Sequence, residues 1–288
     1  MTTIDATLRG AVAGAGDDLT LTLDPAFQGL PDTAHGGSVL ALFDALAARR
    51  GPRTVRGRYL RRVPLGVPLA LTLTHAADAL GCRVADHGGA VLVDGRVAGA
   101  ETHAGPAAGN TGHASSHAPG REAAPLPVSL TCFACGIDNP RGLRTRLTFD
   151  ERSVGGAWTP RADFRGADGG LSAIALTTLL DEAAFWLGAL ASGEAGMTTE
   201  LTVTLHGDAR ANGAVVVGGE RAATRPRADD ARYWDTRVSA RDAAGRPLAT
   251  AAITFVAVRG AARKLVTGLL AMNPPEVVRR VFPAYAAP

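Results

Sequence analysis

The sequence contains few cysteines and almost no lysine, and each shortage argues against a class of protein. Three cysteines, Cys82, Cys132 and Cys135, are too few for the disulfide framework of a small secreted domain. The chain does not open with a basic stretch followed by an apolar one, so we expect a cytoplasmic protein. Lys264 is the only lysine and the net charge is only +3, so nothing indicates a nucleic-acid partner.

The sequence also lacks an uncharged apolar run of membrane-spanning length. Its longest apolar stretch, residues 171–191, has the length of a span but carries Asp181 and Glu182 at its centre. Charged side chains are costly in lipid. We therefore predict a buried helix with a functional carboxylate, and no membrane partner.

The length of 288 residues and the hydrophobic content of 46% predict two globular domains. Residues 105–129 are dense in Gly, Pro, Ala and Ser, which predicts a flexible linker. We expect its His113 and His117 to be solvated rather than bound to metal. The predicted domains are residues 1–104 and 130–260, followed by a C-terminal tail of residues 261–288.

Both halves show the same order of predicted elements, which indicates an internal duplication. A helix at 37–50 and a helix at 171–191 are each preceded by short strands, and Asp44 and Asp181 match at 137 positions apart. One helix followed by antiparallel strands predicts an α+β fold with a curved sheet around a long helix. The predicted strands are residues 19–23, 54–60, 68–75, 82–87, 90–99, 143–149, 156–159, 199–206, 214–223, 233–240 and 248–258.

The most informative motif is His35-Gly36-Gly37 at the start of the first helix. Free backbone N–H groups and the positive end of the helix dipole face outward there, and glycine lets a ligand approach them. Such a turn can hold a thioester carbonyl as it becomes an oxyanion. By spacing alone, the same turn also fits a purely structural role.

The strings HGGSVLALFD, RYLRRVPLGVPL and CFACGIDNPRGL resemble segments of PaaI-type hotdog thioesterases, as does LLDEA in the second helix. The resemblance covers residues 19–104 and 130–259. It implies two hotdog domains in tandem, which together form an intrachain pseudo-dimer. It also implies hydrolysis of an acyl-CoA or related acyl thioester, without a cofactor.

In this family the active site lies between two subunits, one supplying the glycine turn and the other a carboxylate and a strand hydroxyl. The resemblance implies that Gly36 N–H polarises the carbonyl while Asp181 attacks it or activates water, and both routes stay open. The catalytic residues implied are His35, Gly36, Asp181 and Thr199. The substrate-binding residues predicted are Gln28, Gly37, Glu182 and Thr198, together with Arg58 from the basic tract described below. A second, incomplete cleft would contain Asp44 and Ser172.

Two further patterns allow more than one interpretation. Arg56, Arg58, Arg61 and Arg62 either meet the phosphates of coenzyme A or form a solvated strand face. The Cys132-x-x-Cys135 pair is typical of zinc or redox sites, but no further ligand pair is evident. We therefore expect a packed turn and no metal.

Three functions from different classes remain open at this point. Acyl thioester hydrolysis is the leading one, and a non-catalytic module that binds acyl-CoA on the double hotdog is the alternative. A hydratase on the same fold is the third, although no Asp and His pairing at the expected spacing is evident. One chain already supplies both subunits of the family's dimer, and such chains could pair again as a homodimer. The tail is expected to be a docked surface helix or to line a ligand entrance.

Overall fold

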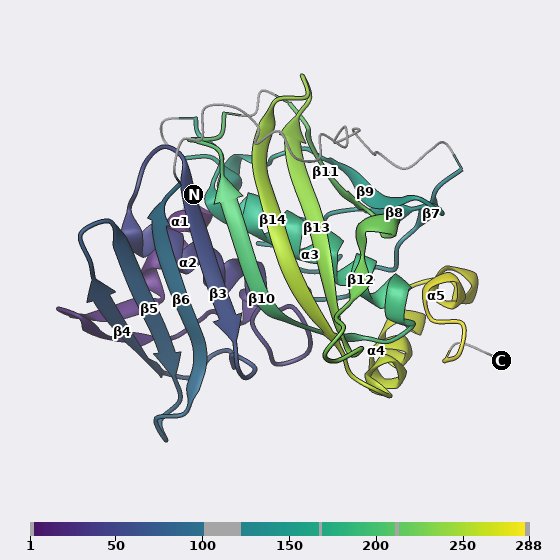
Figure 1. The fold of residues 1–288 in the computed structure, drawn as a ribbon, viewed down its shortest axis with the longest axis horizontal. Helices are drawn as coiled ribbons and strands as arrows, with labels where there is room; N and C mark the ends of the chain where they lie inside the picture. Colours follow the sequence, from purple (N-terminus) through teal and green to yellow (C-terminus); the bar gives the residue numbers. More distant parts are fainter. Residues whose placement is uncertain (1–2, 101–121, 167–168, 211–212, 286–288) are drawn as a thin grey trace.

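A computed structural model describes residues 3–100, 122–166, 169–210 and 213–285. Most of the predicted linker, including His113 and His117, lies outside these residues. The described chain forms one curved antiparallel sheet around two central helices, α2 (Gly36–Ala47) and α3 (Ala173–Ser192) (Figure 1). This is the predicted α+β architecture, a hotdog unit that occurs twice.

In each half short strands precede the central helix and a run of antiparallel strands follows it, as the sequence predicts. The first half supplies β1 (Val12–Ala15), β2 (Asp18–Leu21), β3 (Arg53–Tyr59), β4 (Leu69–His75), β5 (Ala79–Ala85) and β6 (Val91–Gly99). The second half supplies β7 (Ala124–Pro125), β8 (Thr148–Phe149), β9 (Ser153–Trp158), β10 (Gly196–Leu205), β11 (Val215–Glu220), β12 (Arg225–Pro226), β13 (Tyr233–Asp242) and β14 (Pro247–Ala257).

The two halves use the same strand order and meet at the centre of the sheet. Reading outward from the junction, the order is β3-β6-β5-β4-β2 in the first half and β10-β14-β13-β11-β9 in the second. At the junction, β3 and β10 pair antiparallel, with Thr54 opposite Thr204 and Val55 opposite Val203. The matching order is the one expected for a duplicated domain whose two sheets are joined edge to edge.

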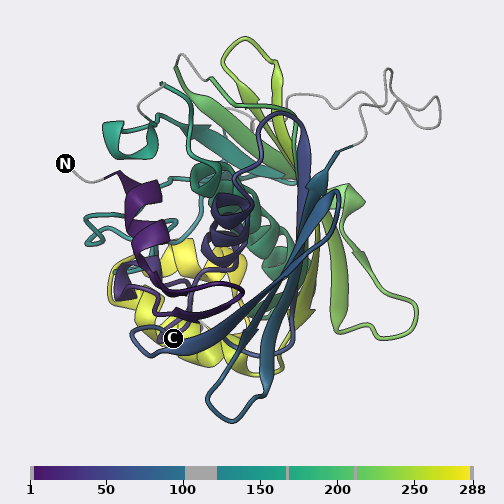
Figure 2. The same cartoon turned by 90° about the vertical axis from the view of Figure 1, so that its left-hand side faces the viewer.

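Helices α2 and α3 pack against each other inside the curve of the sheet (Figure 2). They approach closely at Gly37, where an added Cβ would lie 2.6 Å from the backbone oxygen of Thr177. Thr177 Oγ1 donates a hydrogen bond of 2.7 Å to the backbone oxygen of Gly37. Because glycine has no Cβ, it permits this approach. Asp181 lies one turn after Thr177 on α3, so the first turn of α2 is held against Asp181 as well.

Among the described helices, only α3 is long and apolar enough to cross a membrane. In the structure 83% of its most apolar window is buried inside the fold. Asp181 and Glu182 are buried with it, at 4% and 5% exposure. The helix ends at Gly193, which adopts the left-handed conformation with φ of 69°. It forms the core of the second half.

Both ends of the chain pack on the side of the central helices that the sheet leaves uncovered (Figure 2). The N-terminal helix α1 (Ile4–Gly10) buries Ile4 and Leu8. The C-terminal residues form α4 (Ala261–Leu270) and α5 (Pro275–Val281). Asn273, between these last two helices, exchanges two hydrogen bonds of 2.8 Å with the backbone of Val128. The predicted tail is therefore anchored to the second half.

Two segments differ from the prediction. Residues 122–129 were assigned to the linker, but they include β7, which pairs with β8, and the buried Leu126. The strand predicted at 143–149 is reduced to β8, because the preceding residues form a loop with hydrogen bonds of its own. In that loop, Phe133 N–H donates to the backbone oxygen of Gln28 over 2.6 Å. The loop therefore contacts the first half instead of extending the strand.

Candidate active site

A cavity of about 850 Å³ lies where the two halves meet. Its lining comes from the α2 turn and β3 of the first half, and from α3, β10 and the 129–135 loop of the second. Helix α4 of the tail closes part of it, in line with the ligand-entrance interpretation of the tail. The large apolar side chains that line it include Phe185, Trp186, Leu265, Leu269 and Met272. A cavity of this size and lining suits a small ligand with an apolar part.

Asp181 lies at the centre of a hydrogen-bond network that joins both halves. Its Oδ2 accepts from Gly37 N–H over 2.9 Å and lies 3.2 Å from His35 Nδ1. Its Oδ1 accepts from Thr198 Oγ1 over 2.6 Å. Burial alone would raise the pKa of Asp181, but the hydrogen bonds from His35, Thr198 and Gly37 outweigh it and lower that pKa. The carboxylate is therefore ionised at neutral pH.

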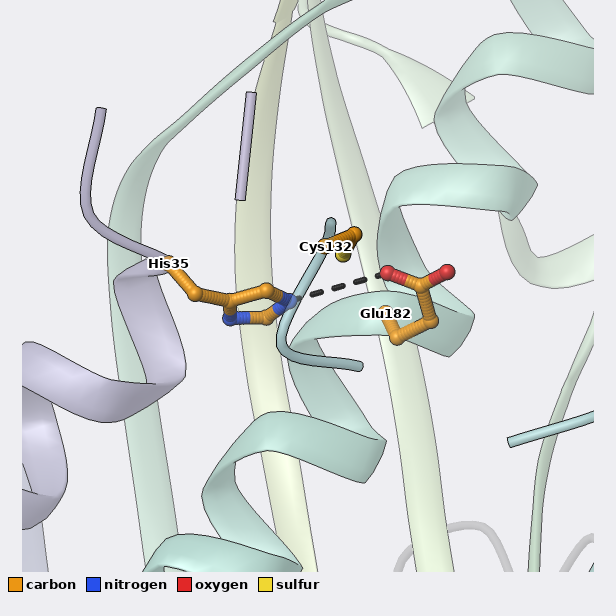
Figure 3. A group of neighbouring side chains, drawn as sticks. All are labelled: His35, Cys132 and Glu182. Atoms are coloured by element: carbon orange, nitrogen blue, oxygen red, sulfur yellow. Dashed lines mark ion pairs between the residues drawn. The ribbon is translucent and has the colours of Figure 1, made fainter. Parts of the chain in front are cut away.

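His35 caps the N-terminus of α2 and lies between two carboxylates. Nδ1 faces Asp181, and Nε2 lies 3.6 Å from Glu182 Oε2 (Figure 3). Burial alone would lower the pKa of His35, but the hydrogen bonds to Asp181 and Glu182 outweigh it and raise that pKa well above its usual value. A protonated imidazole donates from both nitrogens. Gly37 N–H, 3.2 Å from Nδ1, is therefore assigned to Asp181.

Gly36 carries the free backbone N–H of this turn. Within the described part of the chain, no acceptor is bonded to its N–H, and the residue lines the cavity. Tyr59 holds the next peptide group, because its hydroxyl donates to the backbone oxygen of Gly36 over 2.6 Å. A Cβ at position 36 would lie only 2.8 Å from Asp181 Oδ2. Glycine therefore allows a donor at the positive end of α2 to lie beside the carboxylate.

Gly37, predicted to bind substrate, does not line the cavity. Its N–H is bonded to Asp181, and a side chain in its place would collide with the backbone of Thr177 and Thr178. The prediction for Gly37 was wrong because sequence spacing cannot distinguish a glycine that faces a ligand from one that lets two helices approach. Its contribution is to position Asp181.

Thr198 and Thr199 were both candidates for the strand hydroxyl, and only Thr198 contacts Asp181. Thr199 was predicted to be catalytic, but its hydroxyl donates to the backbone oxygen of Thr254 over 3.2 Å. A register shift lies between Thr198 and Glu200 in the pairing of β10 with β14. This irregularity interrupts the alternation of side chains, so the simple strand pattern could not choose between the two threonines.

Gln28 and Arg58, which were predicted to contact the substrate, both line the cavity. Gln28 Nε2 donates to Thr131 Oγ1 over 2.5 Å and so links the two halves. Arg58 is exposed on β3. The cavity is also lined by Arg61, Arg62, Arg227 and Lys264, together with Asp229 and Asp230. We call Arg58, Arg61, Arg62 and Lys264 the basic rim.

The predicted second site is organised differently. Asp44 accepts two hydrogen bonds from Arg53, from Nε at 2.5 Å and Nη2 at 2.9 Å. Ser172 Oγ donates to the Asp5 carboxylate of α1. Neither Asp44 nor Ser172 lines the cavity. The structure therefore gives each residue a separate partner rather than bringing them into one site.

Three residues at the site were not identified from sequence as part of it. Tyr59 holds the α2 turn, and Trp186 Nε1 donates to Glu182 Oε1 over 3.0 Å. The spacing of four residues between Glu182 and Trp186 on one helix was a usable signal for the second contact. Cys132 lines the cavity, and a hydrogen bond from Cys135 lowers the pKa of its thiol. Both cysteines are buried free thiols, as a packed turn would require.

No protein-family model matches the sequence, and neither does any curated protein. Solved structures do match. A candidate thioesterase II of Thermobifida fusca YX is 17% identical, with a TM-score of 0.59, over 90% of this chain and 100% of that one. The tesB protein of Mycobacterium avium subs paratuberculosis is 16% identical, with a TM-score of 0.56, over 88% and 97%.

A dehydratase domain is among the matches too. The domain of RzxB from Pseudomonas fluorescens is 17% identical, with a TM-score of 0.54, over 86% of this chain and 98% of that one. At these identities the likeness establishes the shared hotdog fold. The fold hosts more than one activity on acyl groups, so the activity of this chain has to be argued from its own site.

Proposed function

We propose that this chain is a PaaI-like hydrolase of acyl thioesters, with acyl-CoA as the substrate class. One observation carries the proposal: the ionised Asp181 of the second half and Gly36 of the first half, whose N–H is free at the N-terminus of α2, lie next to each other and line the same cavity. A carboxylate and an oxyanion donor are the two groups that thioester hydrolysis requires. Both lie at one cavity.

The mechanism follows from what each group can do. The substrate carbonyl oxygen accepts from Gly36 N–H, and the α2 dipole stabilises the negative charge that forms on this oxygen when the nucleophile adds to the carbonyl carbon. The carbonyl re-forms as the bond to sulfur breaks. Asp181 takes a proton from a water that attacks the carbonyl carbon, or it attacks the carbon itself to form a mixed anhydride that a water then hydrolyses. Thr198 fixes the orientation of the carboxylate. His35 carries a proton next to Asp181 and is the nearest acid for the departing thiolate.

The cavity lining has an apolar part and a basic part, which together suit an acyl-CoA. Phe185, Trp186 and Leu269 offer apolar contacts to an acyl chain. The basic rim offers cations to the phosphates of a coenzyme A nucleotide. An acyl chain held inside and a charged carrier held at the mouth would place the thioester between them.

The test is release of free thiol from a panel of acyl-CoAs of increasing chain length, measured with a thiol reagent. We expect saturable release for at least one chain length and none above background for the Asp181→Asn variant. Saturable acyl-CoA binding without release from any chain would instead establish the non-catalytic binding module and refute hydrolysis.

A second candidate, hydration or dehydration of an acyl thioester, is favoured by one observation. His35 Nδ1 lies 3.2 Å from Asp181 Oδ2, so a histidine and an aspartate from different halves form the pair that the sequence spacing did not reveal. Such a pair can move protons at the carbons next to a thioester carbonyl. Incubation with 3-hydroxyacyl-CoA distinguishes the two functions: dehydration forms an absorbing enoyl thioester with no free thiol, whereas hydrolysis releases thiol.

A further inference from the structure

Three buried side chains from three separate parts of the chain converge beside the cavity. They are His35 at the start of α2, Cys132 in the loop before β8, and Glu182 in the middle of α3 (Figure 3). One nitrogen, one sulfur and one carboxylate oxygen all lie within 4.8 Å of one another. The nitrogen, His35 Nε2, is already 3.6 Å from Glu182 Oε2.

In the hydrolysis proposed above Cys132 has no role, and Glu182 acts only by helping to raise the pKa of His35. Burying a carboxylate such as that of Glu182 is costly, because the charged group loses contact with water. His35 Nε2 and Glu182 Oε2 face each other as an ion pair, and a bound ion would take the place of the Nε2 proton between them. The other end of each group has a partner of its own. His35 uses Nδ1 for Asp181, and Glu182 uses Oε1 for Trp186. The atoms that face one another are therefore Nε2, Oε2 and the sulfur.

The groups around this cluster hold each donor in place. Asp181 fixes the imidazole ring through Nδ1, and Trp186 fixes the carboxylate through Oε1 over 3.0 Å. Ala134 N–H donates to the Cys132 sulfur over 3.3 Å, which favours a thiolate. Outer hydrogen bonds of these kinds, a carboxylate behind a histidine above all, orient the ligands of metal ions in proteins.

We propose that His35, Cys132 and Glu182 bind one divalent ion of the zinc class, with a fourth position open to the cavity. The mixed set of nitrogen, sulfur and oxygen selects a borderline-soft ion such as Zn²⁺ or Co²⁺ over Mg²⁺ or Ca²⁺, which prefer oxygen alone. Three protein ligands and one open position are the arrangement of catalytic rather than structural zinc sites.

The geometry needs only a small adjustment. Zinc bonds of about 2.0–2.3 Å in a tetrahedron place ligand atoms roughly 3.3–3.8 Å apart. The 3.6 Å between His35 and Glu182 lies inside that range, and the widest separation of 4.8 Å requires the sulfur to move inward by about 1 Å. Cys132 sits in a loop rather than on a helix or strand, so its movement does not break a regular element.

The sequence led us to expect no metal, because Cys132 and Cys135 showed no other ligand pair. Folding supplies two additional donors from residues 97 positions before and 50 positions after Cys132. The cluster shares His35 with the proposed active site and opens onto the same cavity. Binding of the ion is nevertheless measured without substrate, so this inference and the proposed hydrolysis can fail separately.

The test is titration of chelator-treated, reduced protein with Co²⁺, followed by competition with Zn²⁺. A count of three free thiols before the titration establishes that Cys132 and Cys135 are not joined. We expect one equivalent of Co²⁺ to give thiolate-to-cobalt charge-transfer absorption and the visible bands of a tetrahedral ion. One equivalent of Zn²⁺ should remove both.

Three variants separate a built site from adventitious binding. Cys132→Ser should lose the charge-transfer band, and Glu182→Gln, which keeps an acceptor for Trp186, should weaken Co²⁺ binding at least about tenfold. Cys82→Ser is the matched control, since Cys82 is also a buried free thiol but lies on β5 outside the cavity. It should bind Co²⁺ as the parent does.

Circular dichroism and thermal unfolding confirm that each variant is folded. If Cys132→Ser does not fold, Glu182→Gln still decides the question. No charge-transfer band in the parent protein, or a band that survives in folded Cys132→Ser, would overturn the proposal. So would equal affinity in Glu182→Gln and the parent.

Discussion

Asp44 on α2 and Asp181 on α3 occupy equivalent positions in the two halves, but only Asp181 lines the cavity. Asp181 accepts from Thr198 through Oδ1 and from Gly37 N–H through Oδ2, next to His35, but it still lines the cavity. Asp44 is held by Arg53, which engages both carboxylate oxygens. A bidentate arginine pair is geometrically specific and strong. One carboxylate is therefore available to a ligand and the other is fully engaged.

The residues that precede the two central helices also differ: one lines the cavity and the other is bonded to a neighbouring helix. His35 precedes α2, contacts two carboxylates and is followed by the free N–H of Gly36. Ser172 precedes α3 and donates to Asp5 of α1, so a neighbouring helix takes its hydroxyl. A duplicated site can thus become a structural contact when its partners change, although its carboxylate stays in place.

Removal of each carboxylate is the strongest test of this contrast. We expect Asp181→Asn to lower thioester hydrolysis by at least about 10²-fold, because a positioned acid–base or nucleophilic group contributes at least that much. Asp44→Asn should retain most of the activity, because Asp44 does not line the cavity. Thiol release from the best acyl-CoA is the measurement, made well below the unfolding temperature of both variants. Equal losses of activity in the two folded variants would show that Asp44 and Asp181 do not differ in function.

Replacing Asp44 should instead lower the free energy of unfolding. Asp44→Ala leaves the buried guanidinium of Arg53 without its partner, and loss of one member of a buried pair costs about 3–5 kcal/mol. Because Asp208 still lies 3.5 Å from Arg53, we expect the low end of that range, about 3 kcal/mol. Urea unfolding gives the value. Combining Asp44→Leu with Arg53→Met should recover most of it, and failure to recover would argue that the pair is not the cause.

The two neighbouring threonines of β10 allow a finer test. Thr198→Val removes the hydrogen bond to Asp181 Oδ1 and should lower kcat about tenfold, since a hydrogen bond to a charged group is worth about 1.5–3 kcal/mol. Thr199→Val removes a bond to a backbone oxygen instead and is the matched control. We expect its kcat to stay within about twofold of the parent. Initial rates at saturating substrate decide the matter, and a larger effect from Thr199→Val would reverse the assignment.

The smallest expected effect concerns the basic rim. Arg58→Ala should raise KM for acyl-CoA about threefold, because an exposed charge contributes about 0.2–1 kcal/mol. Arg56→Ala is the control, since Arg56 lies on the same strand but pairs with Glu200 and does not line the cavity. The Arg58 effect should vanish in high salt and for acyl-pantetheine substrates, which lack the nucleotide. Equal KM changes for acyl-CoA and acyl-pantetheine would show that the basic rim does not bind the nucleotide.

The sequence was sufficient for the elements that carry their own local signals. Helix α2 begins at the predicted His35-Gly36-Gly37 turn, and α3 covers the predicted apolar run. The shared order of elements predicted the duplication, and the family resemblance led us to pair His35 with Asp181 of the other half. That pairing agrees with the 3.2 Å between them.

The sequence was not sufficient where contacts join distant segments without a local pattern. Arg53 was not singled out, although it holds Asp44, because an arginine at a strand start has many possible partners. The choice between Thr198 and Thr199 depends on an irregularity in strand pairing. The approach of Cys132 to Glu182 depends on a loop whose course is set by contacts with Gln28.

The junction of β3 with β10 has a consequence for how the cleft responds to dilution. When two identical subunits form such a sheet, every site depends on protein concentration, and every substitution appears in both clefts. Here both strands belong to one chain, so their association is intramolecular and proceeds at an effective concentration of order millimolar. The cleft therefore stays assembled at nanomolar protein, and each cleft can change without altering the other.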